Sequence, residues 1–205
     1  SQKFRAQVFP NDPYGRFTVA EDFDKLDRQV LINQYKLTWA SQKPVIFLSG
    51  KISEEQIAYL DQTLGKINYS SSELTIPALS TASNPIKIRE EKEGSVQSSI
   101  RFGLPAISRK DPDYFHFSVM NTVLGGYFGS RLQKNIREDK GFTYGISSSL
   151  APYPRGGYWV VGTDVNGENV DATLAEIKKE ISILQNDLIP QEELDIVKNY
   201  LMGSF

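Results

Sequence analysis

The sequence predicts an α+β fold, with a mixed, mainly antiparallel sheet and helices packed on one face. Three observations lead to this class. Apolar residues alternate with a period of two in several segments after residue 85, they recur at helical spacing in others, and the order is β–β–α–α–β–β–α–α. Strands that are neighbours along the chain favour antiparallel pairing, and helices grouped between them favour α+β over an alternating parallel fold.

Residues 18 to 67 predict a helix, a strand and a second helix. A Thr-x-x-Glu pattern beginning at Thr18 is a capping box before apolar residues at helical spacing. The apolar run from Val45 to Leu48 is typical of a buried strand. A Ser-x-x-Gln pattern beginning at Ser53 opens the next helix. Residues 70 to 84 are rich in Ser, Thr, Ala and Pro without periodicity, which indicates a linker.

The part of the chain after the linker supplies the remaining elements. Strands are predicted at 86–89, 96–104, 143–150 and 158–165, and helices are predicted to begin near Asp111, Ser130, Val170 and Pro190. Between the first two of these helices, Gly125 and Gly126 are expected to allow a sharp turn and close backbone packing. They do not have the spacing or the preceding strand of a nucleotide-binding loop.

Leu132 and Ile136 are expected to form the apolar face of a helix from Ser130 to Lys140, and the turn after this helix carries the most informative residues. Gly141 stands where a left-handed C-cap residue is expected, so the turn is tight. It brings Arg137, in the last helical turn, close to Tyr144, at the start of the next strand. A guanidinium and a phenol together can donate several hydrogen bonds to a carbonyl or a developing oxyanion. The alternative is that Arg137 caps the last carbonyls of the helix and Tyr144 packs on the sheet.

This string of residues resembles a known family. It contains Gly-Gly, Ser-Arg-Leu, Arg-Glu and then a tyrosine seven residues after that last arginine. In this order the motifs resemble the metal-free half-domain of the pitrilysin/insulinase-type zinc metallopeptidases, which carry an inverted zinc motif, and of the related mitochondrial processing peptidases. Further similarity is carried by segments 13–16, 21–23, 47–52 and 111–115.

The resemblance implies how the chain is divided. Residues 1–69 are expected to be the helix–strand–helix tail of a preceding half-domain, and residues 70–84 the linker. Residues 85–205 are expected to be the metal-free, substrate-binding half-domain, truncated at its C-terminus. The resemblance also implies that Arg137 and Tyr144 reach across to a zinc site in the partner half and bind substrate there.

The resemblance further implies how peptide is held. An edge strand that begins with Gly145, Ile146 and Ser147 would pair with the backbone of an extended substrate, as exposed sheet edges do elsewhere. The expected partners are a peptide or unfolded polypeptide and a catalytic half-domain, either in the same chain or in a partner subunit.

No metal site is expected in this chain. The catalytic half of the family carries His-x-x-Glu-His and a further Glu, and a catalytic zinc needs about three protein ligands. This sequence has one histidine, His116, and no cysteine. Because His116 lies between two phenylalanines in an apolar helix, it is interpreted as a structural or surface histidine. Zinc is therefore expected in a missing upstream half, the parent is expected to be a zinc metalloendopeptidase, and this chain alone should not hydrolyse peptides.

Two other functions remain open. The chain can be a non-enzymatic partner or scaffold subunit of the same family, or a peptide-binding module without a hydrolytic partner. The net charge of −2 argues against nucleic acid and anionic membranes as partners, because both favour a basic face. No apolar run reaches the roughly 18 residues of a membrane span. The expectation is a soluble protein, cytoplasmic or periplasmic if it is bacterial.

Overall fold

The computed structural model describes residues 2–39, 44–67 and 77–204. The chain divides into two compact units. Unit 1 consists of Ser1–Phe17 and Ala78–Phe205, and unit 2 consists of Thr18–Pro77. The segment expected to be one piece, residues 1–69, is thus split after Phe17, because the residues before this point pack with the second part of the chain.

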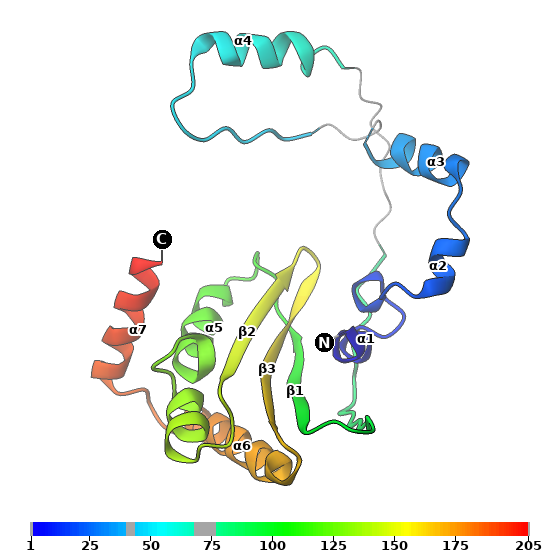
Figure 1. Ribbon diagram of the computed structural model, residues 1–205. Coiled ribbons are helices and arrows are strands. Elements are labelled where there is room, and N and C mark those ends of the chain that lie inside the picture. The colour runs from blue at the N-terminus through cyan, green and yellow to red at the C-terminus, as the bar shows by residue number, and fades with distance from the viewer. Residues whose placement is uncertain (1, 40–43, 68–76, 205) are drawn as a thin grey trace. The chain divides into compact units, whose positions relative to one another are not determined.

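The sheet of unit 1 has three antiparallel strands in the order β1-β3-β2 (Figure 1). They are β1 (Gln97–Ala106), β2 (Ile146–Tyr153) and β3 (Gly156–Asn166). The expected antiparallel sheet is confirmed. The loop between β2 and β3 is shorter than expected, since only Pro154 and Arg155 separate the two strands.

The prediction of a strand at 86–89 was wrong. Its residues form no strand, and the side chains of Ile86 and Ile88 are more than half exposed. An alternation of only four residues supplies too little apolar surface to hold a strand on a sheet without a favourable neighbour.

The helices of unit 1 that follow β1 in the sequence cover one face of the sheet. They are α5 (Tyr114–Asn121), the π-helical turns η2 (Thr122–Gly126) and η3 (Gln133–Asp139), the short 3-10 turn η4 (Gly167–Asn169), α6 (Val170–Asn186) and α7 (Gln191–Gly203). The core contains Leu124, Leu132, Ile136, Ile146, Trp159, Val161 and Ile177. On β3, Trp159 and Val161 are two residues apart and share the covered face, as the alternation of side chains along a strand requires. In the described part of the chain, no helix combines the length and apolar character that a membrane span needs.

The opposite face of the sheet is covered at one end by the N-terminal segment. This segment contains α1 (Gln2–Val8) and η1 (Pro13–Gly15), and α1 lies on the side of the sheet away from α6 (Figure 1). Phe9 is 1% exposed and packs edge-on against Tyr158 of β3. Asp12 binds the guanidinium of Arg155 at 2.8 Å, which fixes the segment to the β2–β3 turn.

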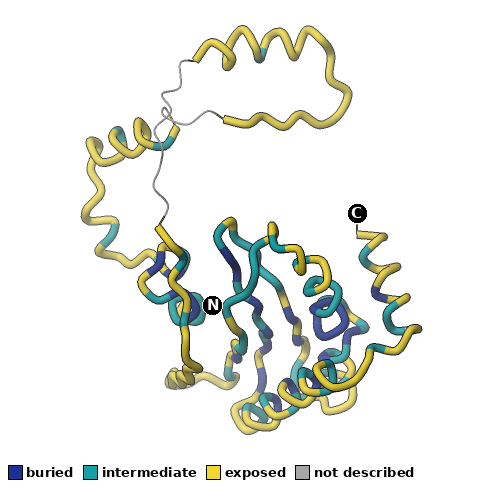
Figure 2. Tube along the Cα trace, turned by 180° about the vertical axis from the view of Figure 1, so that it is seen from behind, coloured by how far each residue is buried: buried dark blue, intermediate teal, exposed yellow. Residues whose placement is uncertain are grey.

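Unit 2 contains three helices in its described part and no strand. They are α2 (Ala20–Asp24), α3 (Arg28–Thr38) and α4 (Glu54–Thr63), and none of them buries a residue (Figure 2). The capping box at Ser53 is confirmed, with Ser53 and Gln56 bonded reciprocally. The first helix starts one residue later than expected, since Asp22 caps the N–H of Val19. It is also broken into α2 and α3.

The prediction of a strand from Val45 to Leu48 was wrong. These residues are irregular and exposed, with Phe47 90% exposed. A strand needs a hydrogen-bonded neighbour, and the described residues of unit 2 offer none.

Candidate functional site

The helix that carries Arg137 is fixed to the core by its apolar face and to its neighbours by polar contacts. Leu132 and Ile136 are both fully buried, as their spacing predicted. Asn135 donates to Glu176 at 2.9 Å and to Glu180 at 2.6 Å, and both acceptors lie on α6. The Asn135 bond holds the pKa of Glu176 below its usual 4.5.

Arg131 braces the same helix against α7. Its guanidinium makes a bidentate pair with Glu193, at 2.9 and 2.6 Å, and both side chains are mostly buried. The bond to Glu193 raises the pKa of Arg131 above its usual range. The Ser-Arg-Leu motif therefore has a structural role, because it joins two helices through Arg131 and the core through Leu132.

Gly141 ends the helix in the left-handed conformation that its position predicted. Its φ is 64°, and the N–H of Phe142 returns to the carbonyl of Ile136 at 3.0 Å. A non-glycine residue is disfavoured at this φ because its Cβ approaches the backbone. The chain thus reverses within a few residues, and β2 begins at Ile146.

Arg137 lies close to Tyr144, as predicted, and the contact is with the backbone of Tyr144 rather than with its phenol. Its Nε donates to the Tyr144 carbonyl at 3.0 Å. The guanidinium lies 4.5 Å from the centre of the Phe128 ring, and Nη1 lies 3.7 Å from a carboxylate oxygen of Glu138. Only one of the five N–H donors of the guanidinium is used in the bond to Tyr144.

The phenol of Tyr144 projects into solvent. Tyr144 is 94% exposed although the preceding and following residues are tied to the sheet. The alternative in which this ring packs on the sheet is therefore wrong. Arg137 does bind a carbonyl, but the acceptor is Tyr144 rather than the last carbonyls of its own helix.

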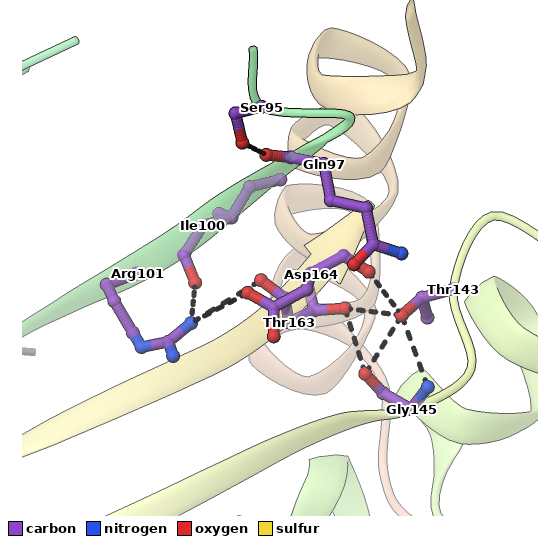
Figure 3. Close-up of polar contacts among 8 residues, drawn as sticks. All are labelled: Ser95, Gln97, Ile100, Arg101, Thr143, Gly145, Thr163 and Asp164. Atoms are coloured by element: carbon purple, nitrogen blue, oxygen red, sulfur yellow. Dashed lines mark hydrogen bonds and ion pairs between the residues drawn. The ribbon is translucent and has the colours of Figure 1, made fainter. Parts of the chain in front are cut away.

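The three residues predicted to hold peptide differ in what they can present. Gly145 and Ser147 are exposed, whereas Ile146 as a whole residue is 1% exposed and lies in the core. In this arrangement Ile146 therefore offers a ligand almost no accessible surface. Gly145 is held by side chains of its neighbours: its N–H donates to Thr143 Oγ1 at 3.2 Å, and its carbonyl accepts from Thr163 Oγ1 at 2.9 Å (Figure 3).

Two shallow depressions meet on the uncovered part of the sheet. The first has a volume of about 270 Å³ and is lined by Arg101, Gly145, Ser147, Ser149, Val160, Gly162, Thr163 and Asp164. The second, of about 590 Å³, is lined by Ser95, Val96, Gln97, Gly141, Phe142, Thr143, Tyr144, Asp164 and Asn166. They share Asp164, and together they extend from the first residues of β2 across to β1.

Sequence reasoning missed Arg101 and Asp164 on this surface. Arg101 Nη1 donates to the Ile100 carbonyl at 2.7 Å and lies 4.0 Å from Asp164 (Figure 3). The available signal was the alternation along β1, which puts Gln97, Ser99 and Arg101 on the face opposite Ile100. Nothing in the sequence said that this face would be left open.

His116 is a surface residue. Its side chain is 86% exposed and lies 3.7 Å from Asp113, so the expected apolar surroundings of this helix position were wrong. The reason is that α5 turns Phe117, and not His116, toward the core. Among the described residues, no group of three His, Cys, Asp or Glu side chains is arranged to hold a metal ion.

Comparison with known proteins identifies the family. The family model described as the peptidase M16 inactive domain matches residues 25–201. An uncharacterized zinc protease YmxG of Bacillus subtilis is 25% identical over 168 residues, which are 81% of this chain and 40% of that protein. A non-peptidase homolog YmxG of Helicobacter pylori is 26% identical over 214 residues, covering 98% of this chain and 47% of that protein.

A solved structure gives the same result for the fold. The crystal structure of a peptidase M16 inactive domain from Pseudomonas fluorescens superposes with a TM-score of 0.85 and 26% identity, over 100% of this chain and 50% of that one. The chain thus spans about half the length of the curated relatives that it matches. The resemblance drawn from the glycine pair, the arginines and Tyr144 is confirmed: the chain belongs to the family of peptidase M16 inactive domains.

Proposed function

We propose that this chain is the non-catalytic portion of a zinc metallopeptidase-like protein, that it holds an extended peptide, and that it contributes Arg137 and Tyr144 to a zinc site in an upstream half. The observation that carries this proposal is the exposure of Tyr144. Tyr144 is 94% exposed although its backbone carbonyl is bonded to Arg137, so the phenol contributes no packing to the fold. It is therefore available to a substrate or to another half-domain.

The arrangement suits stabilisation of an oxyanion. Catalytic donors work best when they are held in place before the substrate arrives, since no energy is then spent on reorienting them. Arg137 is held by its bond to the Tyr144 carbonyl and by the Phe128 ring, and the bond to the carbonyl uses Nε and not the Nη donors. The zinc itself would be held outside the described residues, which offer no set of three suitable ligands.

We also propose that residues 1–69 are the tail of the preceding half-domain, that 70–84 are the linker and that 85–205 are the substrate-binding half. Unit 2 supports this assignment because its described helices bury no residue. Amphipathic helices of this kind are stabilised by packing against a partner, and the relatives are about twice as long as this chain.

Kinetics of the full-length protein test the proposed role of the pair. Tyr144→Phe and Arg137→Ala should each lower turnover about 100- to 1000-fold, the effect of losing one preorganised oxyanion donor. Tyr127→Phe is a matched control, because this ring stacks on Tyr200 at 5.2 Å and has no proposed catalytic role. In urea unfolding, both test variants should lose far less stability than turnover. Wild-type turnover in both test variants would mean that the pair is structural.

The second candidate is a non-enzymatic partner or scaffold subunit. It is favoured by one relative, the Helicobacter pylori protein that is named a non-peptidase homolog. The protein sequence upstream of Ser1 separates the candidates: His-x-x-Glu-His there supports the peptidase, and its absence supports a subunit that lends its residues to another chain. A peptide-binding module without a hydrolytic partner would instead bind peptide with an affinity that chelators do not change.

A further inference from the structure

We propose that Arg101 is a specificity-determining residue, and that it binds the carboxylate of an acidic side chain of an extended peptide in the first of the two depressions. The inference rests on the peptide-holding function proposed above. It adds a preferred class of substrate, peptides that carry a glutamate or an aspartate, and it names the group that selects them.

The guanidinium of Arg101 lies over β3 on the uncovered part of the sheet. Arg101 pairs with Gly162 of β3, and Gly162 also pairs with Ser147 of β2, so these residues form one row across the strands. A Cβ added to Gly162 would lie 3.5 Å from Cζ, Nε and Nη1 of Arg101, which is ordinary contact. The guanidinium therefore rests against β3 at a position where no side chain lifts it away from the sheet.

Only one nitrogen of this guanidinium is used by the protein. Nη1 donates to the carbonyl of Ile100 at 2.7 Å and lies 3.4 Å from the carbonyl of Thr163 (Figure 3). Nε and Nη2 have no acceptor in the part of the chain that the structure describes, and the side chain is 32% exposed. These two nitrogens form one edge of the guanidinium, and such an edge matches the two oxygens of a carboxylate. The edge is thus held in place and accessible to an acidic ligand.

The carboxylate of Asp164 does not satisfy this edge. Its oxygen lies 4.0 Å from Nη1, the nitrogen that is already bonded, and the Asp164 side chain is 58% exposed. A long contact between partly exposed charges contributes little free energy. Asp164 still repels a second negative charge nearby, so it should weaken the binding of an acidic side chain without preventing it.

The rest of the first depression suits one side chain of a longer peptide. Its volume of about 270 Å³ is below the range of about 300–1,000 Å³ that is usual for small-molecule pockets. Ser147 and Ser149 line it and are exposed, and their hydroxyls can donate to a carboxylate. The depression also shares Asp164 with the one that contains Tyr144, so a peptide bound here can continue past the exposed phenol.

The experiment measures the affinity of the full chain for three fluorescent, capped peptides by anisotropy. Each peptide consists of Thr-Val-Ser repeats, and the three differ only at a central residue, which is Glu, Gln or Lys. Arg101→Gln removes the positive charge, Arg101→Lys keeps the charge without the paired N–H groups, and Asp164→Asn removes the opposing charge. Arg109→Gln is the matched control, because this arginine of unit 1 lines neither depression. Urea unfolding establishes that each variant is folded.

The wild type should bind the Glu peptide about tenfold more tightly than the Gln peptide, as expected for a charge-assisted pair that is partly exposed. Arg101→Gln should abolish this preference, and Arg101→Lys should keep only part of it. Asp164→Asn should increase the preference, and Arg109→Gln should leave it unchanged.

Equal affinity of the wild type for the Glu and Gln peptides would overturn the inference while the peptide-holding function stands. A preference that survives in folded Arg101→Gln would do the same. Tighter binding of the Lys peptide, or weaker binding of the Glu peptide by Asp164→Asn, would also overturn it, because the depression would then select a cation. The sign of the Asp164→Asn effect decides the question even if Arg101→Gln does not fold. If the wild type binds none of the peptides, the peptide-holding function itself fails, and the inference fails with it.

Discussion

Gly125→Ala should destabilise unit 1 although alanine is the better helix former. A Cβ on Gly125 would lie 2.7 Å from the backbone N of Ser148 and 3.0 Å from Leu132 Cδ1. Both neighbours are in the core, so the helix must move away from β2. Overpacking of this kind costs about 1–3 kcal/mol, and the helical preference of alanine returns at most about 1 kcal/mol. The expected net loss is about 1–2 kcal/mol.

The assay is urea unfolding followed by the fluorescence of Trp159. This residue is 4% exposed in the core of unit 1, whereas Trp39 of unit 2 is 77% exposed and is replaced by Phe in every sample. Gly145→Ala is the matched control, because a Cβ there meets nothing within 4 Å. The reasoning is refuted if Gly125→Ala unfolds at the same urea concentration as Gly145→Ala.

Three further predictions concern pH, an ion pair and zinc. Burial raises the pKa of Asp12, but hydrogen bonds from the Tyr14 N–H and the Arg155 guanidinium outweigh it, so the pKa lies below its usual 3.8. A carboxyl group with a lowered pKa stabilises the fold at pH values above its usual pKa, and this stability is lost as the pH falls. In urea titrations, the wild type should therefore lose more stability than Asp12→Asn between about pH 5 and about pH 2. A double-mutant cycle of Arg131→Leu and Glu193→Gln should give a coupling free energy of unfolding of about 1–2 kcal/mol. A value near zero would show that this ion pair does not stabilise the packing against α7. The purified chain should retain no stoichiometric zinc after dialysis, and one tightly bound zinc per chain by metal analysis would contradict this.

The sequence predicted well wherever local chemistry decides the structure. The glycine at position 141 needs a left-handed turn, Leu132 and Ile136 need one buried face, and Ser53 satisfies the first amides of its helix; each behaves as expected. The close approach of Arg137 and Tyr144 followed from the same turn. These features depend on residues within a few positions of one another, so periodicity and capping rules capture them.

The errors arose where a partner decides the structure. Val45 to Leu48 and Ile86 to Arg89 have strand-like patterns, but a strand forms only beside another strand, and no pattern within four residues reveals whether one is present. The position of Arg155 beside Asp12 joins residues 143 positions apart in the chain. The exposure of His116 depends on which side of α5 meets the sheet. Long-range packing of this kind cannot be read from a single sequence.

The central claim is that Tyr144 touches the bound peptide, and photo-crosslinking tests it most directly. A benzophenone amino acid is placed at position 144 of the full-length protein, and at position 115 as the control, since Phe115 is 66% exposed on α5 and has no proposed role in binding. Irradiation with a labelled extended peptide should produce a crosslink from position 144 that unlabelled peptide suppresses, and little from position 115. Equal labelling from both positions, or none from position 144 while peptide is bound, would contradict the account.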